Sequence, residues 1–85
     1  MNHSYPQPGD LVLWVRRHDE PFVFPAFVLR VNAHDDSLEL LALTGTGLYN
    51  PSRVLPLEKA ALPHARELRS EGWWKPHPLY EGSRE

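Results

Sequence analysis

The histidines are the side chains most able to bind a metal or transfer a proton, and their spacing supports neither role. His64 and Glu67 are three residues apart, so a helix would carry both on one face. Two ligands are too few for a zinc site. His34, Asp35 and Asp36 stand together in a polar stretch that predicts a solvated turn, because Asp favours turns through bonds to its own backbone. We expect no bound metal and no other cofactor.

Nucleophiles and phosphate-binding loops give no more support to catalysis. None of the serines is flanked by the residues of a nucleophile elbow. No two carboxylates share an apolar setting that would move their pKa values apart. Residues 44–47 (Thr-Gly-Thr-Gly) are followed by neither a helix nor a lysine, which a phosphate-binding loop requires, so they predict a hairpin turn. We therefore expect a protein that is not an enzyme.

Aromatic side chains near the C-terminus are the strongest functional signal. Trp73, Trp74 and Tyr80 occur in one segment together with Pro76 and Pro78. Trp and Tyr are enriched at the centres of protein interfaces, and an extended, proline-containing segment suits a partner's groove. The alternative is that the segment packs back on its own domain. We expect one tryptophan to serve each role.

Two further aromatics, Phe22 and Tyr49, are partner-binding candidates in the central part of the chain. Some aromatics of this region must form the core, because they supply much of the burial in a small domain. A few exposed aromatics could instead surround a methylated cation through cation–π attraction. The sequence alone leaves these two arrangements open.

Length and composition predict one small domain. The chain has 85 residues, of which 41% are hydrophobic and 24% charged, a globular balance. It contains no cysteine, which favours a cytoplasmic or virion setting over a secreted one. The first residues lack the pattern of a signal peptide, and no apolar run reaches the roughly 18 residues that a membrane span needs. The net charge of −2 makes duplex DNA an improbable partner, because non-specific DNA binding relies on Lys and Arg.

The elements that would position these side chains are short strands with brief turns. Pro25 falls inside one of them and requires a sheet edge or a bulge there, because proline cannot donate to the ladder. We expect strands at residues 10–16, 22–31, 37–43, 48–50 and 54–57, a helical turn at 51–53 and a short helix at 63–71. We expect a core that includes Trp14, Ala26, Val28, Leu38 and Leu40.

This pattern predicts an all-β fold, a small SH3-like antiparallel barrel of five strands over residues 10–57. An extended lead-in (residues 1–9) precedes the barrel. Residues 58–85 follow it as a short C-terminal helix and an extended aromatic tail. An OB-like barrel is the second choice, because it normally needs longer strands.

Two stretches of the chain resemble known families. Residues 8–14 (Pro-Gly-Asp-Leu-Val-Leu-Trp) and 25–31 (Pro-Ala-Phe-Val-Leu-Arg-Val) resemble the opening of Tudor and PWWP-type barrels, which implies an SH3-like fold. Residues 46–50 (Thr-Gly-Leu-Tyr-Asn) and 72–76 (Gly-Trp-Trp-Lys-Pro) are similar to motifs of a small tailed-phage protein family. That family has a His between its tryptophans, and this chain has none. The second resemblance implies a phage or prophage origin.

These observations together predict a non-catalytic protein-interaction module that acts in a virion or on a host factor. Its partner would be another protein or a second copy of the chain. One alternative is a small-ligand or nucleotide-binding protein, which would need an oligomer because one small barrel has little room for a pocket. Another is a Tudor-like or nucleic-acid-binding barrel. The latter would need basic side chains on one face beside exposed aromatics, namely Arg16, Arg17, Arg30 and Arg53.

Overall fold

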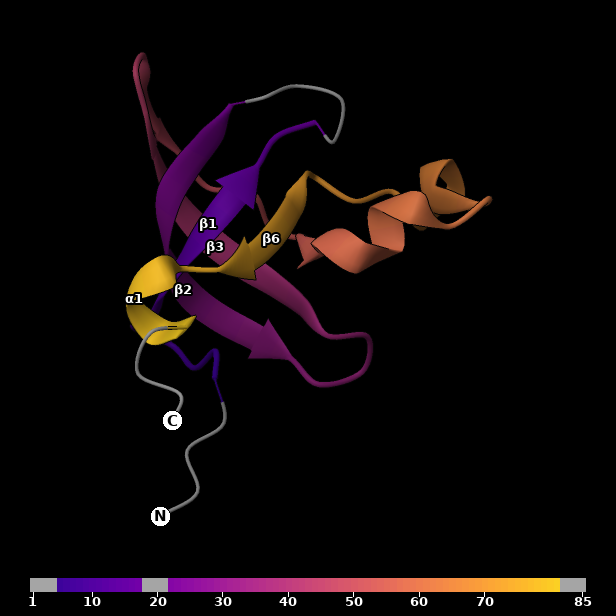
Figure 1. Cartoon of the computed structure of the whole chain (residues 1–85), viewed down its shortest axis with the longest axis horizontal. Helices are drawn as coiled ribbons and strands as arrows, with labels where there is room; N and C mark the ends of the chain where they lie inside the picture. The colour runs from indigo at the N-terminus through magenta and orange to yellow at the C-terminus, as the bar shows by residue number, and fades with distance from the viewer. Residues whose placement is uncertain (1–4, 18–21, 82–85) are drawn as a thin grey trace.

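A computed structural model describes residues 5–17 and 22–81 of the chain. In this part of the chain six strands form one mixed sheet with the order β4-β3-β2-β1-β6-β5 (Figure 1). The first four strands pair antiparallel with their neighbours in the chain, and β5 and β6 pair parallel. The strands are β1 (Leu11–Val15), β2 (Val23–Asn32), β3 (Ser37–Thr44), β4 (Gly47–Tyr49), β5 (Leu55–Pro56) and β6 (Trp73–Pro76). The all-β expectation is therefore confirmed, although the sheet has one strand more than expected.

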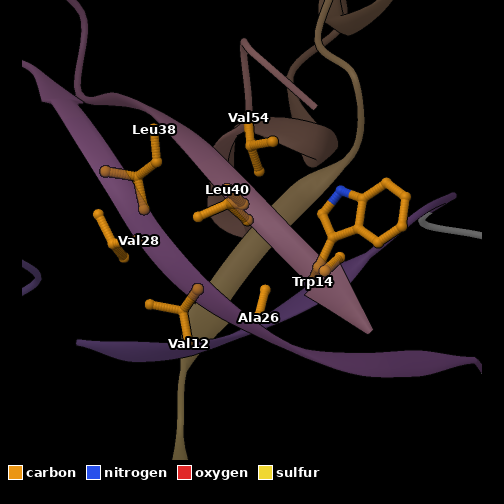
Figure 2. Close-up of a cluster of buried hydrophobic side chains, with 8 residues drawn as sticks. Val12, Trp14, Ala26, Val28, Leu38, Leu40 and Val54 are labelled. Atoms are coloured by element: carbon orange, nitrogen blue, oxygen red, sulfur yellow. The ribbon is translucent and has the colours of Figure 1, made fainter. Parts of the chain in front are cut away.

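The main core lies inside the curl of this sheet. Alternate residues of the three long strands point inward, as period-two burial in a strand requires. The five residues expected in the core are all at most 4% exposed, and most of the cluster is drawn in Figure 2. Its buried members are Val12, Trp14, Ala26, Val28, Leu38, Leu40, Ala42 and Val54.

The curl is fixed by a contact between the two ends of the sheet. The backbone N–H of Leu38 donates to the carbonyl of Val54 at 2.8 Å, and the N–H of Val54 donates back at 2.9 Å. The N–H of Leu40 donates to the carbonyl of Pro51 at 2.9 Å. One half of β3 therefore pairs with β4, and the other half pairs with the chain that leads into β5. This satisfies backbone groups that would otherwise lie at an open edge.

The expectation of an extended tail after a completed barrel is wrong for residues 73–76. These residues form β6, which pairs antiparallel with β1 through Trp14 opposite Trp74 and Val15 opposite Trp73. On its other side β6 pairs parallel with β5, where Leu55 lies opposite Trp73. Without β6, one side of β1 would have no backbone partner, and tryptophan is well suited to a strand.

The expected helix over residues 63–71 is also absent. Two 3₁₀ turns, η1 (Leu57–Ala61) and η2 (Ala65–Leu68), occupy this region instead and project to one side of the sheet in Figure 1. Leu62 is extended, because the residue before a proline disfavours the helical conformation, and Arg69 adopts a left-handed conformation with φ 55°. A single helical turn, α1 (Pro78–Glu81), follows β6.

Smaller departures concern the ends of the strands. The expected helical turn at residues 51–53 is missing, because Pro51 already accepts a bond from β3. Pro25 lies where β2 pairs with β1 alone, since the pairing of β2 with β3 starts at Ala26. A register shift between Val28 and Arg30 marks a bulge further along β2.

No helix among the described residues is long and apolar enough to cross a membrane.

Candidate partner-binding surface

The outward side of the sheet carries apolar side chains where an antiparallel sheet commonly presents polar ones. Leu11 on β1 lies directly opposite Phe27 on β2, and Phe27 lies opposite Leu41 on β3. In a neighbouring row Leu13 lies opposite Pro25. We call this surface the outer apolar face and define it by eight residues: Leu11, Leu13, Pro25, Phe27, Leu29, Leu41, Leu43 and Leu48.

Several members of the outer apolar face are open to solvent. Phe27 is 42% exposed, Leu29 45% and Leu43 46%. Leu48, which lies opposite Leu43 in the β3–β4 hairpin, is 62% exposed. Large apolar side chains gathered in one contiguous patch mark docking sites in soluble proteins, whereas isolated ones do not. Phe27 is central, because it has a leucine of the face on each neighbouring strand.

Charged groups border this face but do not enter it. Lys75 on β6 lies beside Leu13 at one border. At the opposite border Arg30 and Glu39 are paired across β2 and β3, with 3.6 Å between the guanidinium and carboxylate groups. The Arg30 side chain is 81% exposed. The arrangement of an apolar centre with a polar rim is that of a protein interface.

Trp73 and Trp74, two of the expected partner-binding residues, lie against their own chain. Trp73 is 8% exposed and packs with Val15 and Leu55 in a second cluster, which the two 3₁₀ turns cover. Trp74 is half-buried against the main core, and its indole N–H has no hydrogen-bond partner among the described residues. The side chain of Tyr80 lies outside the described part of the structure.

Phe22 and Tyr49 are exposed, at 58% and 44%, but neither belongs to the outer apolar face. The centre of the Tyr49 ring lies 6.1 Å from that of Trp14, and the centre of the Phe24 ring lies 6.0 Å from it. Trp14 is only 4% exposed, so its ring faces are covered. Arg16 lines the adjoining hollow of about 360 Å³. A covered ring and a neighbouring guanidinium make this a poor site for a methylated cation.

A second hollow, of about 450 Å³, lies beside the N-terminal end of the described chain. Tyr5 and Trp74 line it together with Asp36, Glu58 and Lys75. Its volume falls within the range of small-ligand sites.

The cluster of His34, Asp35 and Asp36 forms the β2–β3 turn, as expected. The Asp35 carboxylate accepts a bond from the Ser37 backbone N–H at 3.0 Å and pairs with the Arg53 guanidinium. Hydrogen bonds from Ser37 and then from Arg53 lower the pKa of Asp35 to about 2. Arg53 also donates through Nε to the carbonyl of Leu68 at 3.1 Å, so Asp35 helps to hold η2 in place.

Possible metal ligands do not converge in the part of the chain that the structure describes. Across residues 5–17 and 22–81, no group of three or more His, Asp or Glu side chains lies close enough to hold an ion. His64 precedes η2 and Glu67 lies within it, where the Glu67 backbone N–H donates to the His64 carbonyl at 2.9 Å. This contact is a local turn bond.

Sequence reasoning missed the outer apolar face, although the sequence holds a signal for it. Residues 11–15 (Leu-Val-Leu-Trp-Val) and 23–29 (Val-Phe-Pro-Ala-Phe-Val-Leu) are apolar at both odd and even positions. A strand with one solvated face alternates, whereas a strand covered on both faces reads as a continuous apolar run. The 3₁₀ turns of the chain itself cover Val15 at the end of the first run. Other outward residues of the two runs, such as Phe27 and Leu29, stay exposed, so their apolar character indicates a partner on that side of β2.

Comparisons of the chain with protein-family models, with curated proteins and with solved structures give no match.

Proposed function

We propose that this protein is a non-catalytic protein-interaction module that docks on a partner protein through the outer apolar face. The observation that carries the proposal is the row of Leu11, Phe27 and Leu41, which lie in register across three neighbouring strands on the solvent side of the sheet. The bordering charges of Arg30 and Glu39 are already paired with each other. A partner can thus cover the apolar centre and leave this ion pair intact at the rim.

The free energy available from this surface suits a docking site. Burying a Phe or Leu side chain that is fully exposed is worth about 1.5–3 kcal/mol. Four side chains of the face are each roughly half exposed, namely Phe27, Leu29, Leu43 and Leu48. Covering them would contribute several kcal/mol, part of which offsets the entropy lost on association. Phe27 is the expected hot spot, because hot spots are large side chains near the centre of the patch.

The SH3-like barrel and the phage origin belong to the same proposal. Support for the SH3-like fold comes from four consecutive antiparallel strands, β1 to β4, and from β6, which returns antiparallel to β1. Barrels of this shape serve many unrelated functions, so the fold does not identify the partner. The phage or prophage origin rests on the resemblance of residues 46–50 and 72–76, and it would place the partner in a virion or among host factors.

Selection of peptides from a random library on the wild-type protein tests the docking surface before the partner itself is identified. We expect the selected peptides to bind wild type and a Leu62→Ser control, and to lose at least tenfold in affinity for Phe27→Ser. Leu62 is 38% exposed but lies between η1 and η2, outside the outer apolar face. Loss of one hot-spot side chain costs about 2 kcal/mol or more, which corresponds to this change in affinity.

Peptides that bind Phe27→Ser as tightly as wild type would contradict the proposed surface. Far-UV circular dichroism of both variants shows whether each retains its fold. Leu29→Ser, also on β2 and 45% exposed, serves as a second variant of the face if Phe27→Ser fails to fold.

A further inference from the structure

We propose that the partner covering the outer apolar face is a second copy of this chain, joined face to face about a two-fold axis near Phe27. The inference rests on the proposed docking function and names the occupant of that same surface. A two-fold interface uses one self-complementary patch on both copies. The outer apolar face meets this condition, because all eight of its members are uncharged and apolar.

The area of the face is sufficient for a weak dimer. Phe27, Leu29, Leu43 and Leu48 leave roughly 300–400 Å² open, given their exposed fractions and full areas of about 150–200 Å² for each residue. Two copies would bury about twice this area from these side chains alone. Pro25 and the half-buried leucines raise the total to roughly 1,000 Å², which is the lower limit for a specific interface. We therefore expect a dimer that dissociates on dilution.

The charged border gives the dimer a defined orientation. Glu39 on β3 lies beyond the row of Phe27 in one direction, opposite Arg30. Lys75 on β6 lies beyond that row in the other direction, opposite Leu13. The two-fold axis lies in the plane between the two faces and passes near Phe27. When it is perpendicular to the diagonal from Glu39 to Lys75, it brings Lys75 of each copy opposite Glu39 of the other. Opposite charges at the rim fix register more than they add affinity.

Sedimentation velocity over a concentration series of the full chain tests the dimer. We expect wild type to shift from monomer to dimer between about 10 µM and about 1 mM, the range expected for an interface of the smallest specific size. Phe27→Ser should stay monomeric over the same range, whereas the Leu62→Ser control should dimerise like wild type. If Phe27→Ser loses its circular dichroism spectrum, Leu29→Ser takes its place.

Charge exchange tests the two-fold arrangement. Lys75→Glu alone and Glu39→Lys alone should each weaken dimerisation by roughly tenfold, because the two-fold axis repeats the rim ion pair and each variant removes both copies of it. The double variant should recover part of the lost association, because the two charges again attract across the axis while the pair between Arg30 and Glu39 within each copy stays broken. A double variant no better than either single variant would overturn this arrangement.

A wild type that remains monomeric at about 1 mM would overturn the dimer, as would a dimer that Phe27→Ser and Leu29→Ser leave intact. Either result is distinguishable from failure of the proposed function. If wild type is monomeric but selected peptides still depend on Phe27, the face docks on a different protein. If the peptides are also indifferent to Phe27, both proposals are wrong.

Discussion

Gly72 lies directly against the indole ring of Trp14. The preceding carbonyl, that of Glu71, accepts the indole N–H at 3.0 Å. A Cβ added to Gly72 would overlap the indole nitrogen and come within 3.0 Å of the Val15 carbonyl oxygen. Gly72 also has φ 104°, a conformation that other residues rarely adopt. This contact therefore sets the point at which the chain leaves the 3₁₀ turns and enters β6.

Gly72→Ala should lower the free energy of unfolding by at least about 2 kcal/mol, because it combines backbone strain with a collision in the core. Gly45→Ala is the matched control, since Gly45 lacks a positive φ and has nothing within 4 Å of its added Cβ. The control should change the free energy of unfolding by no more than about 0.5 kcal/mol. Urea unfolding followed by tryptophan fluorescence measures both. Equal stability of the two variants would contradict the described position of Gly72.

Leu40→Ala should lower the free energy of unfolding by about 2–5 kcal/mol, the usual effect of truncating a buried leucine. Leu40 is fully buried in the main core. Leu43→Ala, in the same strand but on the outer apolar face, should cost less than about 1 kcal/mol. The comparison is made by urea unfolding at low protein concentration, where any association is negligible. A larger effect at Leu43 would mean that β3 presents its other side to the core.

Trp73→Ala should lower the free energy of unfolding of the monomer by about 3–5 kcal/mol, because Trp73 packs against Val15 and Leu55. Phe22→Ala should leave stability nearly unchanged, since Phe22 is 58% exposed. Thermal unfolding followed by circular dichroism measures both without relying on tryptophan emission. A stable Trp73→Ala monomer that has lost association would instead identify Trp73 as a partner anchor.

Acidification should remove a contribution that Asp35 makes to stability. The pKa of Asp35 in the folded protein is about 2, below its ordinary value of 3.8, because Ser37 and Arg53 favour the charged carboxylate. The stabilisation is therefore complete above about pH 4 and disappears as the pH falls towards about 2. The difference in unfolding free energy between wild type and Asp35→Asn should shrink over this interval in urea titrations. A difference that stays constant with pH would show that the charge of Asp35 contributes nothing.

The strand pattern and the core could be predicted from local sequence. Residues such as Val28 and Leu40 lie in runs rich in β-branched and large apolar side chains, and such runs favour strands wherever they pack. The turn at His34, Asp35 and Asp36 was also readable, because Asp forms turns through its own backbone. Sequence alone therefore determined an all-β fold, its first three strands and most of its inward side chains.

The places of Trp73 and Trp74 were decided by the tertiary structure. Residues 72–76 read equally well as a tail, because nothing nearby in the sequence supplies a strand partner. The partner is β1, some 60 residues earlier, whose unpaired backbone groups β6 satisfies. Likewise, residues 63–71 do not form the expected helix, and the 3₁₀ turns of this region cover Trp73 and Val15. Pairing between strands distant in the chain depends on closure of the whole sheet. The local preferences of the residues in one strand cannot predict that closure.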